Sequence, residues 1–136
     1  METRGVLTPD TITEARTVYD ESGPVAQTVV REVARAMDLD REEYRKRVTP
    51  AVVETARDAI FAGMLQVSLA DRETFTDWRA THPGAVTVAG HEEARNVVWH
   101  VGPDERAVAA TYNDEPDAAV STLRRQAFGR LYRDYL

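Results

Sequence analysis

Residues 95–112 read RNVVWHVGPDERAVAATY, and this stretch decides the fold of the second half of the chain. Two runs rich in valine, alanine and aromatic residues flank GPDE at 102–105, which has the residues of a type I turn with proline in the second position. Such runs on either side of a turn are typical of a β-hairpin. The sequence therefore predicts two antiparallel strands that meet at this turn.

The turn also predicts which side chains share a face of the hairpin, because side chains alternate along a strand. Pairing residue 101 with residue 106 gives one face of larger side chains: Val97, Trp99, Val101, Val108, Ala110 and Tyr112. The other face then carries small or half-polar side chains: Asn96, Val98, His100, Ala107, Ala109 and Thr111. We expect the two later helices to cover the large face and to leave the small face open.

Two further strands are predicted outside the hairpin, at LQVSLA (65–70) and AVTVAG (85–90). Their valines and leucines are expected to join the large face. Between these strands, DRETFTDWRATHPG (71–84) predicts a capped helix that ends at Pro83-Gly84. Pro116 opens a final helix, which can run to the C-terminus.

The hydrophobic pattern is helical in the part of the chain before Gly63. Thr8-Pro9 is a helix-start signal, and ESGP at 21–24 is expected to end that first helix. A second helix is predicted from about Pro24 to Met37, with Val25, Val29, Val33 and Ala36 facing one way. Shorter signals predict a helix in DREEYRKRV (40–48), where Asp40 and Glu43 are spaced as a capping box, and another from Thr49-Pro50.

Together these elements predict an α+β fold. A helical N-terminal half is expected to pack with a four-stranded, mostly antiparallel sheet and two further helices. A chain of 136 residues fits one compact domain. We therefore expect a single domain over 1–136, with a helical half at 1–63 and the sheet with its two helices at 64–136.

The composition indicates a cytoplasmic, acidic protein. The chain has 23 acidic and 17 basic residues, a net charge of -6, and Lys46 is its only lysine. Acid excess with arginine in place of lysine suits a GC-rich genome and a cytoplasm of high salt, where screening weakens self-repulsion. A mildly acidic protein from another GC-rich source is the alternative. No apolar run approaches the length of a membrane span, and the N-terminus lacks a signal-peptide pattern.

No motif indicates catalysis, a metal or a cofactor. The chain has no cysteine, which excludes disulfides and thiolate chemistry. His82, His91 and His100 do not have the spacing of a zinc site, and no phosphate-binding glycine loop is present. None of the 23 carboxylates is singled out as an acid or base. We therefore expect no metal and no cofactor, and we name no catalytic residue.

The terminal segment STLRRQAFGRLYRDYL (121–136) carries four arginines and one acid. At helical spacing one apolar stripe forms along it: Val120, Leu123, Ala127, Phe128, Leu131 and Tyr135. Arg124 falls in the middle of this stripe, so it is expected to form an internal ion pair, to line an anion or partner pocket, or to lie in a different register. Arg125, Arg130 and Arg133 point elsewhere and are expected on a solvated face, where acids in the segment 64–120 of the same chain or of a dimer mate can balance them. The tentative binding residues are Arg124, His100, Arg125, Arg130 and Arg133.

The chain resembles a family of small haloarchaeal proteins of unknown function. The resemblance is carried by GPVAQTVVREVARAM (23–37), DREEYRKRV (40–48) and DAAVSTLRRQAFGRLYR (117–133), and it covers nearly the whole chain. It implies a high-salt setting. It implies no activity and no site residues.

These observations lead to three hypotheses about function. The first is a non-catalytic interaction or regulatory module of unknown partner, a homodimer in a high-salt cytoplasm, with its contact on the small sheet face or the terminal helix. The second is a nucleic-acid-associated protein that uses the terminal arginines with Tyr132 and Tyr135. It is less favoured, because no wider basic patch is evident and the helix from Thr49 offers few base-reading side chains. The third is an enzyme with an unrecognised site. A membrane partner is not expected.

Overall fold

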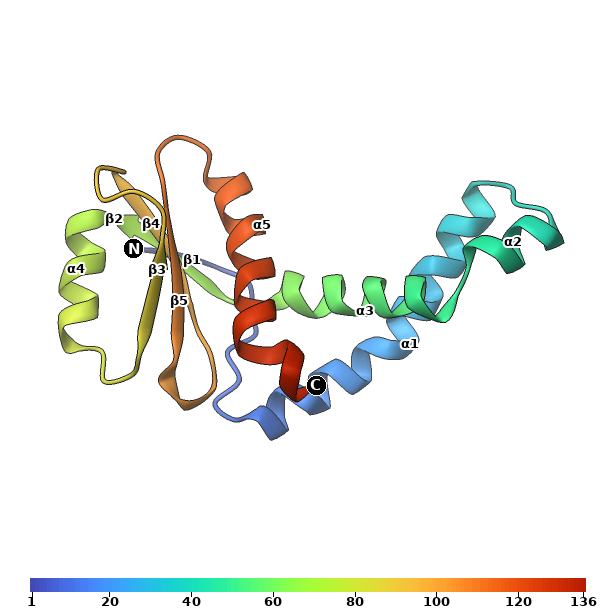
Figure 1. Ribbon diagram of the computed structural model, residues 1–136, viewed down its shortest axis with the longest axis horizontal. Helices are drawn as coiled ribbons and strands as arrows, with labels where there is room; N and C mark the ends of the chain where they lie inside the picture. Colours follow the sequence, from blue (N-terminus) through green and yellow to red (C-terminus); the bar gives the residue numbers. More distant parts are fainter.

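A five-stranded sheet forms the centre of the structure, a computed structural model that describes residues 1–136 (Figure 1). Across the sheet the strands are β1 (Glu2–Arg4), β2 (Val67–Asp71), β4 (Asn96–Val101), β5 (Ala107–Tyr112) and β3 (Val86–Ala89). Three neighbouring pairs are antiparallel, and only β3 and β5 are parallel. The α+β class and the four predicted strands are confirmed, but the sheet has a fifth strand.

The additional strand, β1, lies at the edge of the sheet and pairs with β2. Its three residues, ETR, are polar, so they carry no alternating hydrophobic signal. Gly5 follows at φ +95°, a conformation that side chains disfavour, and the chain then runs to Leu7, which bridges to Leu65. Backbone pairing with β2 thus holds this strand, and its side chains contribute little.

The β4–β5 hairpin differs from the predicted pairing by one residue. Val101 pairs with Ala107, because Asp104 and Glu105 both adopt left-handed conformations and the connection is longer than a type I turn. A shift of one residue moves every side chain of β5 to the opposite face. Val108 therefore lies beside His100, and Ala109 lies beside Trp99.

Helices cover both faces of the sheet (Figure 1). On one face α4 (Arg72–Thr81) packs Phe75 against a cluster that contains Val97, Trp99 and Ala109. On the other face α5 (Pro116–Ala127) covers the side chains of β2, β4 and β5. The prediction of an open small face is wrong, since its members Val98, Ala107 and Ala109 are at most 2% exposed.

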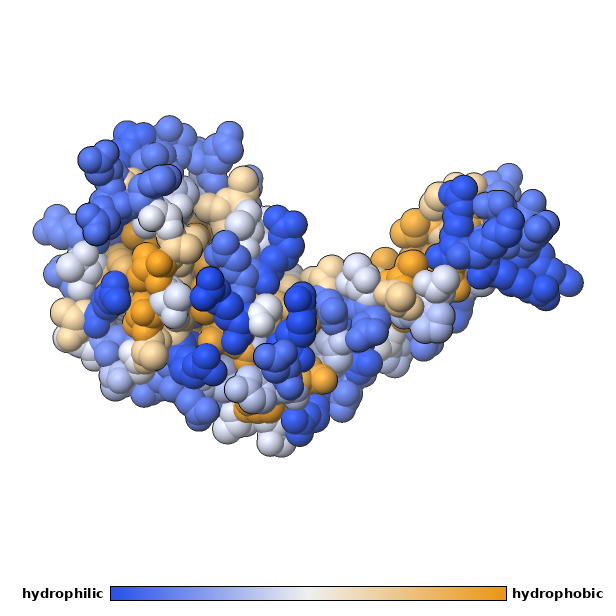
Figure 2. Space-filling model, viewed as in Figure 1, coloured by the Kyte–Doolittle hydropathy of each residue, from blue (hydrophilic) through white to orange (hydrophobic).

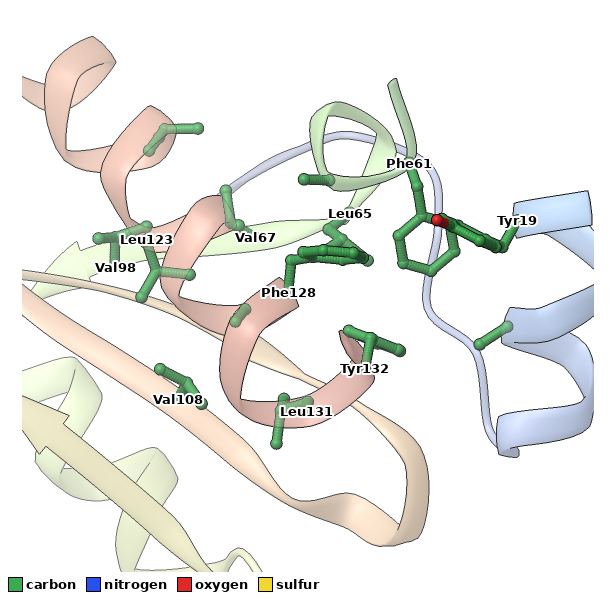
Figure 3. Close-up of a cluster of buried hydrophobic side chains, with 14 of the residues drawn as sticks. Tyr19, Phe61, Leu65, Val67, Val98, Val108, Leu123, Phe128, Leu131 and Tyr132 are labelled. Atoms are coloured by element: carbon green, nitrogen blue, oxygen red, sulfur yellow. The ribbon is translucent and has the colours of Figure 1, made fainter. Parts of the chain in front are cut away.

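The main core lies where α5 meets the sheet on one side and two long helices on the other (Figure 3). Val98 and Val108 reach it from the sheet, and Leu123, Phe128 and Leu131 reach it from the terminal helix. The two long helices contribute Tyr19 and Phe61. Phe61 packs edge to face against Tyr19 and against two aromatic rings of the terminal segment, Phe128 and Tyr132. Val67 and Leu69 also point into this core, so their predicted place beside Trp99 is wrong.

The first helices form an arm that projects from the sheet (Figure 1). They are α1 (Ile12–Ala36), α2 (Arg41–Arg47) and α3 (Pro50–Met64). α3 runs back alongside α1, with α2 at the tip of the arm. The predicted caps Asp40 and Thr49 are confirmed, each accepting a hydrogen bond from a backbone N–H three residues on. α1 begins after Thr11 and not at Thr8-Pro9.

The predicted break at ESGP is wrong, because α1 continues through Pro24. A proline inside a helix removes one backbone hydrogen bond and disturbs the carbonyls of the preceding turn. Arg57 of α3 binds this turn: its Nε donates to the carbonyl of Tyr19 at 2.8 Å, and its Nη2 lies 3.2 Å from a carboxylate oxygen of Asp20. A contact from another helix thus supports the turn that the proline weakens.

Candidate functional sites on the terminal helix and the arm

Four of the five candidate binding residues lie in the terminal segment, whose helix α5 packs on the core through one buried face. Val120, Leu123 and Ala127 are buried, as predicted. The next turn, Phe128–Tyr132, is wound as a π-helix, which takes more residues per turn and so rotates the following side chains. As a result Tyr132 is fully buried and Tyr135 is 49% exposed, which reverses the predicted stripe at its end. Tyr132 is therefore not accessible for stacking on a base.

His100 lies inside the core and not at an open surface. Its Nδ1 is 2.6 Å from the carbonyl oxygen of Gln66, and its Nε2 is 2.7 Å from the hydroxyl of Tyr132. Because a carbonyl can only accept, Nδ1 carries the hydrogen, and Nε2 accepts from the tyrosine. Burial lowers the pKa of His100, and the nearby charge of Arg124 lowers it further. The prediction that His100 is a binding residue has no support, because the side chain is 1% exposed.

Arg124 is half-buried and makes no ion pair, so the predicted pairing with an acid of the helical half is wrong. Its Nε donates to the carbonyl of Leu65 at 2.9 Å. A Cβ on residue 5 would stand 2.6 Å from the carbonyl oxygen of Leu65 and 2.7 Å from Nη2 of Arg124, so glycine at this position leaves room for both. Burial lowers the pKa of Arg124, and the positive charge of Arg4 lowers it further.

A hollow of about 390 Å³ adjoins Arg124 between β1, the end of α3 and α5. Its lining residues are Arg4, Ala59, Ala62, Gly63, Asp117, Val120, Ser121, Arg124 and Arg125. Arg4 is already occupied, since it pairs with Glu2 at 2.6 Å and with Asp117 at 2.7 Å. The hydrogen bonds that Arg4 donates to these two carboxylates raise the pKa of Arg4. The hollow thus combines positive side chains with one acid.

Arg125, Arg130 and Arg133 are exposed, and none of them forms a salt bridge. These three arginines thus form a solvated face, and no acid of the segment 64–120 pairs with them within the chain. The guanidinium of Arg133 lies over the ring of Phe128, with 5.4 Å from Cζ to the ring centroid. Of the five predicted binding residues, only Arg124 and Arg125 line the same hollow.

A second candidate surface lies on the arm, and we call it the arm face. It consists of exposed apolar side chains: Val25, Val29, Val33 and Met37 from the α1 end, and Val52 from α3. Each is between 42% and 53% exposed. Figure 2 shows hydrophobic side chains gathered on the arm. Apolar side chains lying singly on a surface are normal, but several side by side mark an interaction site.

The arm face occupies one side of the α1–α3 hairpin. At spacings of three and four residues, α3 places Ala56, Ile60 and Gly63 in line with Val52. The opposite side has a groove of about 690 Å³, in which the polar residues Gln27, Arg31 and Glu54 lie among hydrophobic ones such as Val48 and Val53. The hairpin therefore has one apolar side and one mixed side, in addition to the seam between its helices.

Sequence reasoning detected part of the arm face but misread its environment. The valines at 25, 29 and 33 form a predicted stripe, as expected for a buried helix face. In the structure the seam with α3 is made by smaller neighbours, Ala26, Val30 and Ala34, which are buried. Ala and Val at the seam let the helices approach closely and leave the adjacent stripe in solvent.

The structure contains neither a cluster of metal ligands nor a helix that could span a membrane. No group of three or more histidine, aspartate or glutamate side chains is positioned to hold a metal ion. His82 ends α4, as predicted, where it stacks on Trp78 and binds the carbonyl of Glu105 at 2.6 Å. None of the helices has the length and the apolarity needed to cross a membrane.

Comparison with known proteins gives one match. The model of a family described as a family of unknown function (DUF5809) matches residues 6–133 of the 136-residue chain. No curated protein and no solved structure matches the chain. The match therefore covers the arm, the terminal helix Pro116–Ala127 and every strand of the sheet except β1.

Proposed function

The chain belongs to the DUF5809 family of unknown function, and we propose that it is a non-catalytic interaction module that forms a homodimer through the arm face. The observation that carries the proposal is the row of half-exposed apolar side chains on the arm. Leaving such side chains in water forgoes roughly 25 cal/mol for each Å² of apolar surface. A partner that covers them recovers this free energy.

The chain itself cannot cover the arm face. α1 and α3 already use their inner stripes on each other, and the arm extends away from the sheet and from α4 (Figure 1). The base of the arm is held by Tyr19 and Phe61, which pack against Phe128. The exposed valines lie farther along the arm, where no other element of the chain faces them.

A second copy is the partner that fits this surface best. The face is built almost entirely from valine, and two such hairpins can pack across a two-fold axis as a four-helix bundle. From Val25 to Met37 the face is about 20 Å long, and two adjacent helices make it about 20 Å wide. Two copies then bury on the order of 1,000 Å² in total, the lower range of specific interfaces.

The charges around the arm face do not oppose this contact. Glu32 lies at its edge on α1 and already pairs with Arg35 at 3.4 Å within the same helix. No unpaired arginine or lysine needs to be buried. High salt strengthens apolar association and screens the repulsion between two chains of charge -6 each. The acidic composition and the haloarchaeal resemblance therefore support a homodimer that works in a salt-rich cytoplasm.

The nucleic-acid hypothesis has less support. The terminal arginines are free of ion pairs, but Tyr132 is buried and cannot stack on a base. Arg130 and Arg133 are moreover not gathered with Arg124 in one groove. The homodimer thus explains a surface that the nucleic-acid hypothesis leaves unused.

The test is the mass of the particle in solution. Light scattering in molar KCl at about 100 µM protein should give twice the chain mass, a concentration at which a dimer of micromolar Kd is nearly complete. V29D should give the monomer mass, because a charge in the centre of the contact would be desolvated without a partner. Q27D adds the same charge to α1 on the mixed side of the hairpin and should remain a dimer.

Circular dichroism confirms that each variant is folded. A wild-type chain that is monomeric at this concentration contradicts the dimer. A dimer that withstands both V29D and V33D shows that the contact lies on another surface.

A further inference from the structure

We propose that the hollow beside Arg124 binds the phosphoryl group of a small phosphorylated molecule. The guanidinium groups of Arg124 and Arg125 and the hydroxyl of Ser121 are its donors, and Arg4 adds positive charge. The proposal does not depend on the homodimer. It concerns a different surface, and a different measurement tests it.

The first argument is the state of the Arg124 guanidinium. Its Nε donates to the carbonyl of Leu65, and its Nη2 lies in the space that a side chain on residue 5 would enter. Nη1 and Nη2 make no hydrogen bond within the chain, although the group lines the hollow. A guanidinium held in place with its outer donors free has the geometry that binds two oxygens of an anion side by side.

The second argument is electrostatic. Arg124 is half-buried beside Arg4, and no carboxylate pairs with it. Two positive groups held together in partial burial repel each other. An anion bound between them replaces this repulsion with attraction toward both. The neighbourhood therefore favours a negative ligand more than an isolated surface arginine does.

The third argument identifies the charge and size of the ligand. The lining has three arginines and Asp117, and Glu2 pairs with Arg4 at 2.6 Å, so three positive and two negative charges leave a net charge of +1. A phosphate monoester carries about -1.5 to -2 at neutral pH and has three acceptor oxygens. The volume of about 390 Å³ leaves room for more than the phosphoryl group, and it lies in the range of small-molecule sites.

Asp117 is the competitor for this site. Its carboxylate binds Nη1 of Arg4 at 2.7 Å, and its side chain is 93% exposed. It can therefore rotate into solvent when a phosphoryl group arrives, but its charge opposes binding while it stays. Removing that charge should strengthen the binding of an anion, which is the opposite of the effect expected if Asp117 served only to stabilise the fold.

The experiment is isothermal titration calorimetry at constant ionic strength. The ligands are inorganic phosphate, glycerol 3-phosphate and acetate. We expect saturable binding of both phosphates and tighter binding of the ester, because the hollow extends beyond the phosphoryl group. Acetate should bind at least about tenfold more weakly than phosphate, since it has one charge and two oxygens.

The variants locate the site. R124M should weaken phosphate binding by about tenfold or more, the loss expected for a charge-assisted pair of hydrogen bonds. D117N should tighten it severalfold. R130M removes an exposed, unpaired arginine outside the hollow and should bind as the wild type does. V29D should also bind normally, because the arm face lies away from the hollow.

Two results overturn the proposal. One is the absence of saturable phosphate binding to the wild-type chain. The other is equal loss in R124M and R130M, which shows non-specific attraction to the arginines. If circular dichroism shows that R124M is unfolded, R125Q replaces it and should also lose affinity relative to R130Q.

Discussion

At the scale of single residues, His100 is a buried group whose protonation the fold controls. It is buried between the carbonyl of Gln66, the hydroxyl of Tyr132 and the sheet, with the positive charge of Arg124 nearby. No carboxylate faces the ring to compensate a positive charge on it. In the neutral form with hydrogen on Nδ1, that nitrogen donates to the carbonyl of Gln66, and Nε2 accepts from the hydroxyl of Tyr132. Folding favours this neutral histidine, because burial lowers the pKa of the ring.

The preference of the folded chain for a neutral His100 predicts that the protein loses stability in acid. The ordinary pKa of histidine, about 6.5, applies to the unfolded chain, so His100 contributes its full stability above that value. As the pH falls from about 6.5 toward the lower pKa that His100 has in the folded chain, the unfolded chain binds a proton that the folded chain does not bind. The free energy of unfolding should then drop by up to about 1.4 kcal/mol per pH unit.

Guanidinium denaturation at about pH 7 and about pH 5 measures the difference. H100Q should be less stable than the wild type at both pH values. Its free energy of unfolding should, however, fall less between about pH 7 and about pH 5 than that of the wild type. H91Q, at an exposed position, should keep the wild-type slope. Equal slopes in H100Q and the wild type would contradict the assignment.

At the scale of elements, the junction of α1 with α3 decides whether the arm is rigid. Arg57 donates to the carbonyl of Tyr19, and its Cζ lies 4.1 Å from the centroid of that ring. The hydroxyl of Tyr19 is in turn 2.6 Å from a carboxylate oxygen of Asp58, and burial raises the pKa of this tyrosine to about 12. These contacts surround the turn before Pro24, which lacks a backbone donor.

Removing Arg57 should loosen the arm while the sheet stays intact. In R57M, amide hydrogen exchange across residues 19–37 should accelerate about tenfold, the effect of losing roughly 1.4 kcal/mol of local stability. β4 and β5 should keep their protection, because their hydrogen bonds lie in the sheet. R31M, which removes an exposed arginine of the same helix, is the matched control. A uniform increase over the whole chain would show that the contact stabilises the entire fold.

At the scale of the whole molecule, the distribution of charge determines how the protein responds to salt. The chain carries -6, and its seven salt bridges involve side chains that are mostly exposed. Exposed pairs contribute little to stability. Repulsion among the remaining acids is therefore the larger electrostatic effect, and salt weakens it.

The melting temperature should accordingly rise by several degrees between low and molar KCl. Scanning calorimetry over a salt series measures the rise. A variant with E92Q and E93Q, two exposed acids that form no salt bridge, should show a shallower rise, since it has less repulsion to screen. A flat or falling melting temperature would mean that screening of the favourable ion pairs outweighs screening of the repulsion.

The sequence alone determined the class of fold and most of its elements. Short-range signals were sufficient where the chain interacts with itself locally: Asp40, Thr49 and Asp71 cap the helices that follow them, and Pro116 opens the terminal helix. Alternating valines predicted four strands, because that pattern requires only that one face be buried. Arg124 was identified as anomalous for the same reason, as a charge on an apolar stripe.

The tertiary structure decided everything that depends on which surface meets which. Val101 pairs with Ala107, so the side chains of β5 lie on the faces opposite to those predicted. One extra residue in the turn is enough to move every side chain of a strand to the other face of the sheet. A π-helical turn placed Tyr132, and not Tyr135, against His100. α1 continues through Pro24, and Arg57 from a distant segment binds the turn before the proline. The arm face is open for the same physical reason: periodicity shows that a stripe is apolar, but only the three-dimensional packing shows whether another element of the chain reaches it.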